Sequence, residues 1–294
     1  MVLKTAPCGF WPVDTLILSY FLGISLLTLF YWSRVPGAAW LIALQIAGVL
    51  LVVVAERALA SRFRPVASFF RHWYPWLAVG VAYKEMGILI PAIRRSDADA
   101  ALARLDIALW GVHPTVWLER IQTTALTEFL QITYSLFIPA LLLVAAVLWW
   151  QRRVGEFRYY VFLITLGFLA SFLGYILVPA RGPRYLLDHL QTRPLEGWWS
   201  FPVLRAALDW LEGIHYDCFP SGHTALTVLA WWSSRGLSRG FFWAYSAYTA
   251  CMVFSTVYLR YHYAIDTVAG AAVAAALLAA TPYLYGPRQP YGEG

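Results

Sequence analysis

The chain has 294 residues, of which 60% are hydrophobic and 13% are charged. Soluble domains are typically about 45–50% apolar and about 25% charged, so this composition excludes an ordinary soluble domain and predicts an integral membrane protein. The formal charge of +6 is modest and gives no indication of nucleic-acid binding. Cys8, Cys218 and Cys251 are widely separated and predict neither a disulfide framework nor a zinc site.

The apolar segments predict an all-α polytopic helix bundle. A spanning helix needs about 20 mostly apolar residues, and this rule gives about eight spans, at 15–33, 38–56, 74–93, 127–150, 158–179, 221–236, 240–258 and 264–284. Only Lys4 precedes the first segment and no small-residue cleavage site follows it. We therefore expect a retained helix rather than a cleaved signal peptide.

The distribution of arginine predicts the orientation. With the N-terminus inside, the cytoplasmic loops and their edges contain Arg57, Arg62, Arg64, Arg71, Arg152, Arg153, Arg158, Arg235 and Arg239 against the single acid Glu156. Basic residues favour the cytoplasmic side, whereas loops 94–126 and 181–220 are balanced in charge. We expect a plasma- or inner-membrane protein whose balanced loops face the extracytoplasmic side.

Two amphipathic stretches, 98–121 and 199–214, are too poor in apolar residues to span. In the first, Leu102, Leu105, Ile107 and Leu109 recur at roughly helical spacing. Both stretches fall on the outer side, where such helices can lie in the interface plane over the mouth of the bundle. The alternative is a pair of loop helices packed on the protein surface.

Three polar clusters fall on the predicted outer face, at 178–187, 219–224 and 255–266. Ionisable residues at membrane depth are costly and mark candidate functional sites. Because the three clusters come from separate parts of the chain and share one face, they predict one common site.

The first two clusters suit a phosphate. Arg181 and Arg184 offer planar guanidinium groups that match phosphate oxygens, and a Gly-Pro turn keeps them close. Ser221 is placed to cap a helix that starts at Gly222 and His223. A helix N-terminus binds anions through its free N–H groups and positive dipole end.

The third cluster supplies a nucleophile. His262 and Asp266 are four residues apart and share a face if they lie on a helix, where the carboxylate can fix the histidine tautomer. Together with His223 as acid and base, this set predicts phosphoryl transfer through a phosphohistidine at His262. There is no cluster of carboxylates for a metal, so we expect a metal-free mechanism without a cofactor. Each piece alone also has a structural reading, as a cap, an interfacial histidine, a buried pair or a headgroup anchor.

These motifs resemble the type 2 phosphatidic acid phosphatase family, relatives of the vanadium haloperoxidases. The family pattern comprises Lys-x6-Arg-Pro, Pro-Ser-Gly-His and Ser-Arg-x5-His-x3-Asp. The second motif is present in full at Pro220–His223, and the third at Ser255, His262 and Asp266. The resemblance implies His262 as nucleophile, Asp266 as its partner and His223 as acid/base. It also implies a six-helix core, so we place it in a domain 74–294, after a domain 1–73 of two added N-terminal helices.

The sequence departs from the family pattern at the arginines. Thr256 occupies the arginine position of the third motif, and Arg260 follows one helical turn later, where it can reach the same phosphate. The first motif is absent as Lys-x6-Arg-Pro. Arg181 and Arg184 take its place, and Arg193 before Pro194 is the alternative.

The stretch Asp106…Gly111…Pro114…Trp117 resembles, more loosely, the branch that contains the inositol phosphorylceramide synthases and their bacterial relatives. This resemblance implies a polyol or another lipid alcohol as acceptor in place of water. The expected partners are a phosphorylated lipid substrate, such an acceptor and the bilayer. A rival of another class is a transporter or binding protein for phosphorylated lipids, but no repeat with interrupted helices is found.

The roles of four further residues are left open by the sequence. Lys84 and Glu85 lie in the third span and either hold an acceptor or pair with other helices. Tyr134 and Asp217 are near the predicted site, and Asp217 orients either His215, an acceptor hydroxyl or only its own loop.

Overall fold

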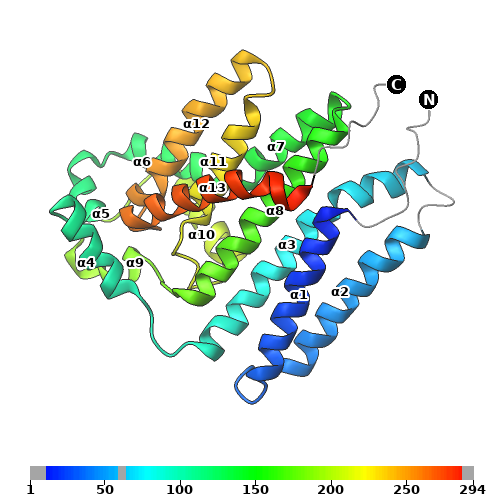
Figure 1. Cartoon of the computed structure of the whole chain (residues 1–294). Helices are drawn as coiled ribbons and strands as arrows, with labels where there is room; N and C mark the ends of the chain where they lie inside the picture. Colours follow the sequence, from blue (N-terminus) through cyan, green and yellow to red (C-terminus); the bar gives the residue numbers. More distant parts are fainter. Residues whose placement is uncertain (1–10, 59–63, 287–294) are drawn as a thin grey trace. The chain divides into compact units, whose positions relative to one another are not determined.

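The computed structural model describes residues 11–58 and 64–286. These residues form helices and connecting loops without a β-strand (Figure 1), which confirms the predicted all-α class. The chain divides into two compact units, Met1–Ile93 and Arg94–Gly294. The segment 74–93, predicted to open the second domain, is the last part of a helix that packs on α1 and α2 and so belongs to the first unit.

The first unit contains α1 (Pro12–Phe30), α2 (Ala38–Ala58) and α3 (Arg64–Ile93), coloured blue to cyan in Figure 1. Pro12 begins α1, where the missing N–H costs no helical hydrogen bond. Gly37 has a φ of +67° in the turn before α2, a conformation that glycine adopts without a Cβ penalty.

Buried polar groups join the three helices of this unit. Asp14 accepts hydrogen bonds from Arg71 and Tyr74. Gln45 donates to Glu85 at 3.1 Å and accepts from Ser25 at 2.5 Å. Polar groups in an apolar bundle are stabilised only when such partners are present. Glu85 therefore pairs with a residue of another helix, Gln45 of α2, which was one of the two roles considered for it.

The second unit has a longer series of helices around one centre. Its elements are α4 (Asp99–Trp110), α5 (Pro114–Trp117), the 3₁₀ turn η1 (Leu118–Ile121), α6 (Thr124–Ser135), α7 (Phe137–Trp150), α8 (Val154–Leu177), α9 (Pro183–Leu186), the 3₁₀ turn η2 (Asp188–Leu190), α10 (Ser200–Glu212), α11 (Gly222–Ser234), α12 (Arg239–Tyr258) and α13 (Ala264–Tyr285).

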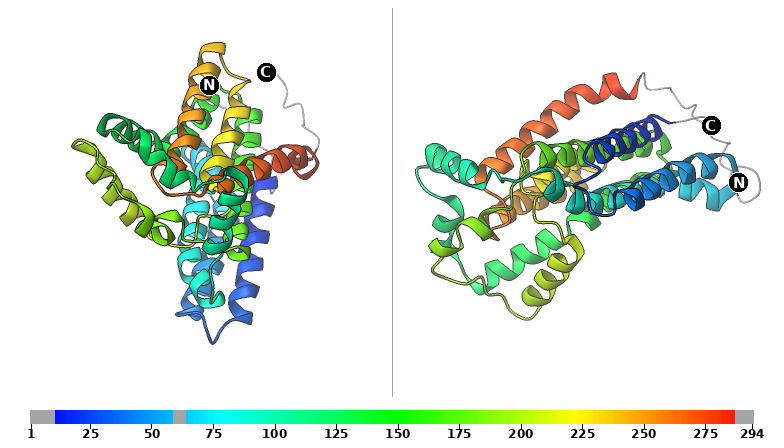
Figure 2. Two further views of the ribbon diagram at one scale, coloured as in Figure 1. Left: turned by 90° about the vertical axis from the view of Figure 1, so that its left-hand side faces the viewer. Right: turned by 90° about the horizontal axis from the view of Figure 1, so that it is seen from below.

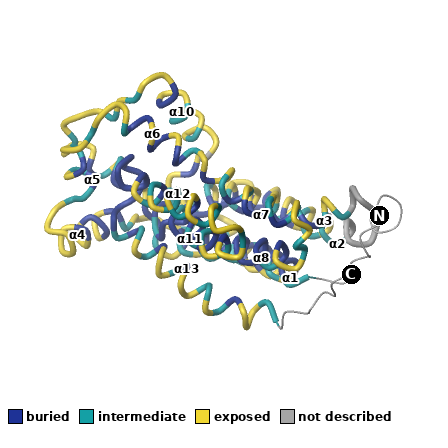
Figure 3. The backbone as a smooth tube through the Cα atoms, turned by 90° about the horizontal axis from the view of Figure 1, so that it is seen from above, coloured by how far each residue is buried: buried dark blue, intermediate teal, exposed yellow. Residues whose placement is uncertain are grey.

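Helix α11 is the centre of the second unit, in contact with α7, α8, α12 and α13. Its residues and those of α8 are largely buried, as Figure 3 shows. Ser221 and Ser238 cap α11 and α12 by accepting backbone N–H groups, as expected for serine before a helix. The site residues at the start of α11 therefore sit on a central and largely buried helix of the unit.

Helices α6 and α10 pair on one side of the second unit (Figure 2). Glu128 on α6 accepts backbone N–H groups of Trp198, Ser200 and Phe201 at the start of α10, and the Ser200 hydroxyl also donates to it. A carboxylate at a helix N-terminus satisfies N–H groups that have no helical partner. This contact fixes α10, the second predicted amphipathic helix, beside the bundle.

All eight predicted spans coincide with helices, and several of these are long and apolar enough to cross a bilayer. Among the described residues these are Pro12–Phe30, Ser68–Ile93, Val154–Leu177 and Ala264–Tyr285, and a fifth if Thr124–Ser135 and Phe137–Trp150, bent by 49°, form one span. Helix α11 has only 13 residues, about 20 Å at 1.5 Å per residue. Helix α12 is long enough but rich in tyrosine, serine and threonine, which lower its hydropathy.

Candidate active site

Two histidines meet at the centre of the second unit. Nδ1 of His223 lies 3.3 Å from Nε2 of His262. His223 is on the first turn of α11, and His262 is in the segment between α12 and α13. The second and third sequence clusters are therefore brought together by the packing of α11 against α12 and α13.

The other ring nitrogen of His262 faces a main-chain oxygen. Its Nδ1 lies 2.8 Å from the carbonyl oxygen of Cys218 and 3.5 Å from the carboxylate of Asp266. A carbonyl accepts but cannot donate, so this contact places the proton on Nδ1 and leaves Nε2 as the basic nitrogen when the ring is neutral. The Nε2 atom that faces His223 is thus the one able to attack.

The contact between His262 and Asp266 does not arise from a shared helical face. Helix α13 begins at Ala264, so His262 lies before it. Asp266 is in the first turn and accepts the backbone N–H of Tyr263 at 2.9 Å and the thiol of Cys218 at 2.8 Å. The predicted spacing brings the two residues together for another reason, because the carboxylate caps the helix that starts just after the histidine.

Cys218 was not identified from the sequence as part of the site. Its carbonyl holds His262 and its thiol holds Asp266. Burial raises the pKa of this thiol well above its usual range, and the charge of Asp266 adds to the effect. The only available signal was its position three residues before Ser221, which did not distinguish it from an ordinary buried cysteine.

The start of α11 is built partly as predicted. Ser221 caps it, accepting the N–H of Thr224 at 3.2 Å, and its own N–H donates to the carbonyl of Asp266 at 3.1 Å. The N–H of Thr224 is therefore not free to bind an anion. Within the described part of the chain, the N–H groups left for an anion are those of Gly222 and His223.

Gly222 has a packing role as well. A Cβ built on it would collide with the hydroxyl of Tyr175 on α8. The absence of a side chain lets the first turn of α11 lie directly against α8. This close approach explains the glycine between Ser221 and His223 independently of any ligand.

Aromatic rings hold His223. Tyr134 and Phe137 lie with ring centroids 4.6 and 4.4 Å from that of His223. The hydroxyl of Tyr134 is 3.5 Å from Nδ1 of the histidine. Tyr134 also stacks on Tyr261 at 4.3 Å. Tyr134, which had no settled role in the sequence, thus contacts the histidine pair directly.

The predicted arginines take different positions. Arg184 pairs with Asp209 of α10 at 2.8 Å, and its guanidinium lies over the rings of Tyr185 and Tyr261. Arg181 is exposed, with its guanidinium 4.4 Å from the Tyr185 ring. Tyr261 therefore contacts both Arg184 and Tyr134, the ring that lies beside His223.

The sequence spacing predicts that Arg260 lies on the same helix as Thr256, one turn later. In the structure Arg260 lies beyond the end of α12. The helix ends at Tyr258, and Arg260 has a φ of +67°, a left-handed conformation that is unfavourable for a residue with a side chain. Its guanidinium binds Glu119 at 3.1 Å and the carbonyl of Arg193 at 2.6 Å. Arg193 thus contacts Arg260 through its backbone carbonyl, and Arg193 itself is an exposed residue.

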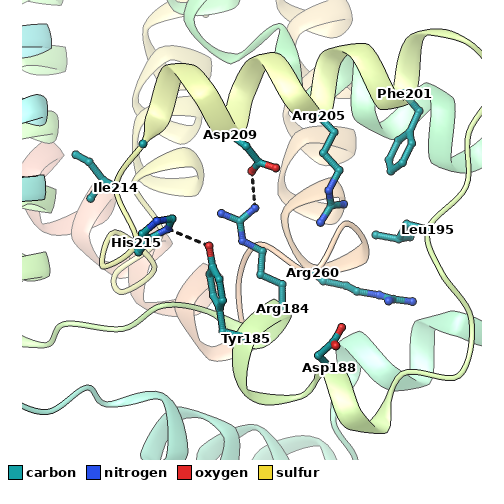
Figure 4. A pocket seen from close by; sticks show the side chains of 11 residues that line it. Arg184, Tyr185, Asp188, Leu195, Phe201, Arg205, Asp209, Ile214, His215 and Arg260 are labelled. Carbon is teal, nitrogen blue, oxygen red and sulfur yellow. Dashed lines mark hydrogen bonds and ion pairs between the residues drawn. The ribbon is translucent and has the colours of Figure 1, made fainter.

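A pocket of about 450 Å³ adjoins these residues (Figure 4). Arg184, Arg205 and Arg260 line it together with Asp188, Asp209 and His215. Neither His223 nor His262 is part of its lining. The structure therefore brings Arg184 and Arg260 into one cavity and the histidines into a separate pair. Tyr261 lies between the two groups, because it contacts Arg184 and Arg205 and also stacks on Tyr134.

Helix α4 positions two of the motifs through buried acids. Asp99 accepts the backbone N–H groups of Arg181 and Gly182, both at 2.7 Å, and the hydroxyl of Tyr263 at 2.9 Å. Asp106 accepts those of Ala264 and Ile265 at 3.0 and 2.8 Å. Sequence analysis did not assign these roles, because side chains that bind distant backbone groups have no local pattern.

The buried face of α4 carries two acids, and most of the apolar residues that recur along this stretch lie outside it. It consists of Asp99, Leu102, Ala103 and Asp106, whereas Leu105, Ile107 and Leu109 are 47%, 44% and 58% exposed. The acids point inward because their carboxylates have backbone donors there. The apolar side chains that were expected to form one stripe with Leu102 remain on the outside.

Cys218, His262 and Asp266 also form a group with metal-ligand chemistry. One ligand atom from each lies within 4.8 Å of the others, and all three residues are buried. In the structure these atoms face one another as the hydrogen-bonded set described above. Asp217 is half-buried in the preceding loop, and its role stays a prediction, as do the acceptor roles of Lys84 and Glu85.

The fold and this site define a helical membrane protein with a pair of histidines, His262 buried and His223 half-buried, and with an arginine-lined pocket. A comparison with protein-family models matches the PAP2 superfamily over residues 100–280. The match covers more than half of the chain, and the protein belongs to the PAP2 superfamily, which supports phosphatase-type activity on a phosphoester. Searches of the curated proteins and of the solved structures found no match.

Proposed function

We propose that this protein cleaves or transfers the phosphate ester of a membrane lipid through a phosphohistidine at His262, without a metal. The observation that carries the proposal is the orientation of His262. Its Nδ1 is engaged by the carbonyl of Cys218 at 2.8 Å, and its Nε2 faces His223 at 3.3 Å. A histidine with one nitrogen fixed as donor presents the other as a nucleophile.

The first half of the reaction forms a bond from Nε2 of His262 to phosphorus and breaks the bond from phosphorus to the ester oxygen. His223 donates a proton to the leaving alkoxide. In the second half, His223 takes a proton from water or from an alcohol, whose oxygen attacks phosphorus and releases His262. The N–H groups of Gly222 and His223 suit the equatorial oxygens, with Ser221 setting the helix end.

We assign Arg181, Arg184 and Arg260 to the negative charge of the phosphate. Arg184 and Arg260 line a common pocket, and Arg260 precedes His262 by two residues. Consecutive Cα atoms are about 3.8 Å apart, so the Cα atoms of these two residues lie within about 7.6 Å. That distance is well within the reach of an arginine side chain toward a phosphate on the histidine.

Hydrolysis and transfer share the first half-reaction and differ in the acceptor. A specific observation favours an alcohol acceptor as a second candidate: the pocket beside the histidines offers the carboxylates of Asp188 and Asp209, groups that accept hydroxyl protons. Transfer to a polyol or lipid alcohol is the activity expected from the looser resemblance to the inositol phosphorylceramide synthases. We place the site on the extracytoplasmic side, as the arginine distribution indicates.

The test uses the full chain in detergent micelles with a phosphate-labelled lipid, with and without alcohols, following free phosphate and new lipid. His262→Ala should abolish both products, and the wild-type protein should carry an acid-labile, base-stable label. His189→Ala, a change at an exposed histidine, is the matched control and should retain turnover. Full activity of His262→Ala, or a base-labile adduct, would show that the nucleophile is another residue.

A further inference from the structure

We infer that the arginine pocket is a subsite for a second anionic group of the substrate headgroup, and that Arg205 is the residue that binds it. The inference rests on the proposed function, since it concerns the lipid that reacts at His262. It assigns a role to Arg205, which belongs to none of the sequence motifs and projects from α10 into the pocket (Figure 4).

Arg205 differs from the other arginines of the pocket in its partners. Arg184 pairs with Asp209 at 2.8 Å, and Arg260 pairs with Glu119 at 3.1 Å. Among the described residues Arg205 has no ion pair, and its guanidinium instead lies over the rings of Phe201 and Tyr261 at 5.8 and 5.5 Å. It is the cation of this pocket whose charge is left for a ligand.

A second positive charge increases the demand for an anion. Arg260 is only 7% exposed, and Figure 4 shows its side chain crossing the pocket beneath Arg205. Burial lowers the pKa of Arg260 and the charge of Arg205 adds to this effect, whereas the carboxylates of Glu119 and Asp188 oppose it. The lining also carries the carboxylates of Asp188 and Asp209, and Asp209 already pairs with Arg184. Like charges that face one space repel each other, and an anion bound by Arg205 would lessen this repulsion.

The size and position of the pocket favour a headgroup over the reacting phosphate alone. Its volume of about 450 Å³ lies in the range of about 300–1,000 Å³ that is typical of small-molecule sites. The histidines are not in its lining, but Arg260, which is, lies two residues before His262. Tyr261, the residue between them, has the guanidinium of Arg205 over its ring. A lipid whose phosphoester meets His262 can therefore extend its headgroup into the pocket.

The lining distinguishes an anion from a quaternary ammonium group. Ammonium headgroups are bound on open aromatic faces. Here a guanidinium lies over each of the rings of Tyr185, Phe201 and Tyr261. Because arginine already occupies these aromatic partners, the group best matched is a carboxylate or phosphate, which can bind the planar guanidinium in a bidentate manner.

The experiment compares two lipids that carry the same phosphomonoester. One is a diacylglycerol phosphate with no other charge, and the other bears an additional phosphodiester in its headgroup. Arg205→Gln should raise KM for the doubly anionic lipid by about tenfold, the effect of losing roughly 1.4 kcal/mol of binding, with kcat retained. For the singly anionic lipid KM should change by less than about twofold, and Arg205→Lys should be intermediate.

Arg104→Gln, which removes the charge of an exposed arginine on α4, is the matched control and should alter neither KM. Equal effects of Arg205→Gln on both lipids, or no effect on either, would overturn the inference. Equilibrium binding of the same lipids to His262→Ala separates the two proposals. If His262→Ala binds the doubly anionic lipid more tightly than the singly anionic one, and adding Arg205→Gln removes this difference, the subsite is supported even if the wild-type protein turns over neither lipid. If His262→Ala binds the two lipids equally well, the subsite is refuted independently of catalysis.

Discussion

Nδ1 of His262 lies 2.8 Å from the carbonyl oxygen of Cys218. The carboxylate of Asp266, the group expected to orient this ring, is farther away at 3.5 Å and is occupied by the N–H of Tyr263 and the thiol of Cys218. The ring is thus oriented mainly by the main chain, and the carboxylate supports the segment that carries it.

Asp266→Asn should therefore reduce turnover by less than the roughly 10⁴-fold that is lost when a carboxylate alone sets the histidine tautomer. The carbonyl of Cys218 still holds Nδ1, and the amide oxygen of asparagine can still accept the N–H of Tyr263. The measurement is kcat on a phosphorylated lipid. His262→Ala should give only background turnover, and Asp97→Asn, a change at an exposed position, should retain nearly the wild-type kcat. A loss as complete as that of His262→Ala would show that the carboxylate, and not the carbonyl, sets the tautomer.

The Cys218 thiol should resist alkylation in the folded protein. Burial, and then the charge of Asp266, raise its pKa, and only the thiolate reacts. In a Cys8→Ser, Cys251→Ser background, maleimide labelling at about pH 8.5, the pKa of an ordinary cysteine, should be slow until the protein is unfolded. The matched comparison keeps Cys251, which is half-buried, and replaces Cys218. Rapid labelling of native Cys218 would contradict the hydrogen-bonded, enclosed thiol.

Gly222→Ala should destabilise the second unit by about 1–3 kcal/mol, the usual cost of overpacking, because its methyl group collides with the hydroxyl of Tyr175. Thermal unfolding in detergent measures the effect. Gly240→Ala on α12, with open space around the added methyl, should be neutral or slightly stabilising. Tyr175→Phe should partly rescue Gly222→Ala, and the absence of rescue would mean that the collision is elsewhere.

Acid should favour the folded state through Asp106. Burial raises its pKa most, the charge of Asp266 acts in the same sense, and the N–H groups of Ile265 and Ala264 oppose it. A folded-state pKa above the unfolded value of about 3.9 means that the folded protein binds the proton more tightly. The stability due to this group is therefore full below the unfolded pKa and lost as pH rises through the folded one.

Asp106→Asn removes this titration. Between about pH 4 and pH 7, the unfolding temperature of the wild type should fall more than that of the variant. The lost acceptor shifts the unfolding temperature of the variant by the same amount at every pH and does not affect this comparison. Asp97→Asn, at an exposed acid, should retain the wild-type slope. Parallel curves for wild type and Asp106→Asn would rule out a raised pKa at Asp106.

Local features of the amino-acid sequence are sufficient to predict the membrane class, the helix positions and the motif residues. Apolar length and helix-capping residues are local properties, so the eight predicted segments coincide with helices. The motif at Pro220–His223 and the set Ser255, His262 and Asp266 indicated the superfamily before the family comparison did.

The contacts that hold the site could not be predicted from the sequence, because they arise from helix packing. The carbonyl of Cys218 on His262, the carboxylates of Asp99 and Asp106 on distant backbone groups, and Arg205 in the pocket all join residues far apart in the chain. Such contacts depend on how the helices pack. The left-handed backbone of Arg260 and the start of α13 at Ala264 are likewise set where two helices meet, which is why helical spacing did not predict the partners of Arg260 or His262.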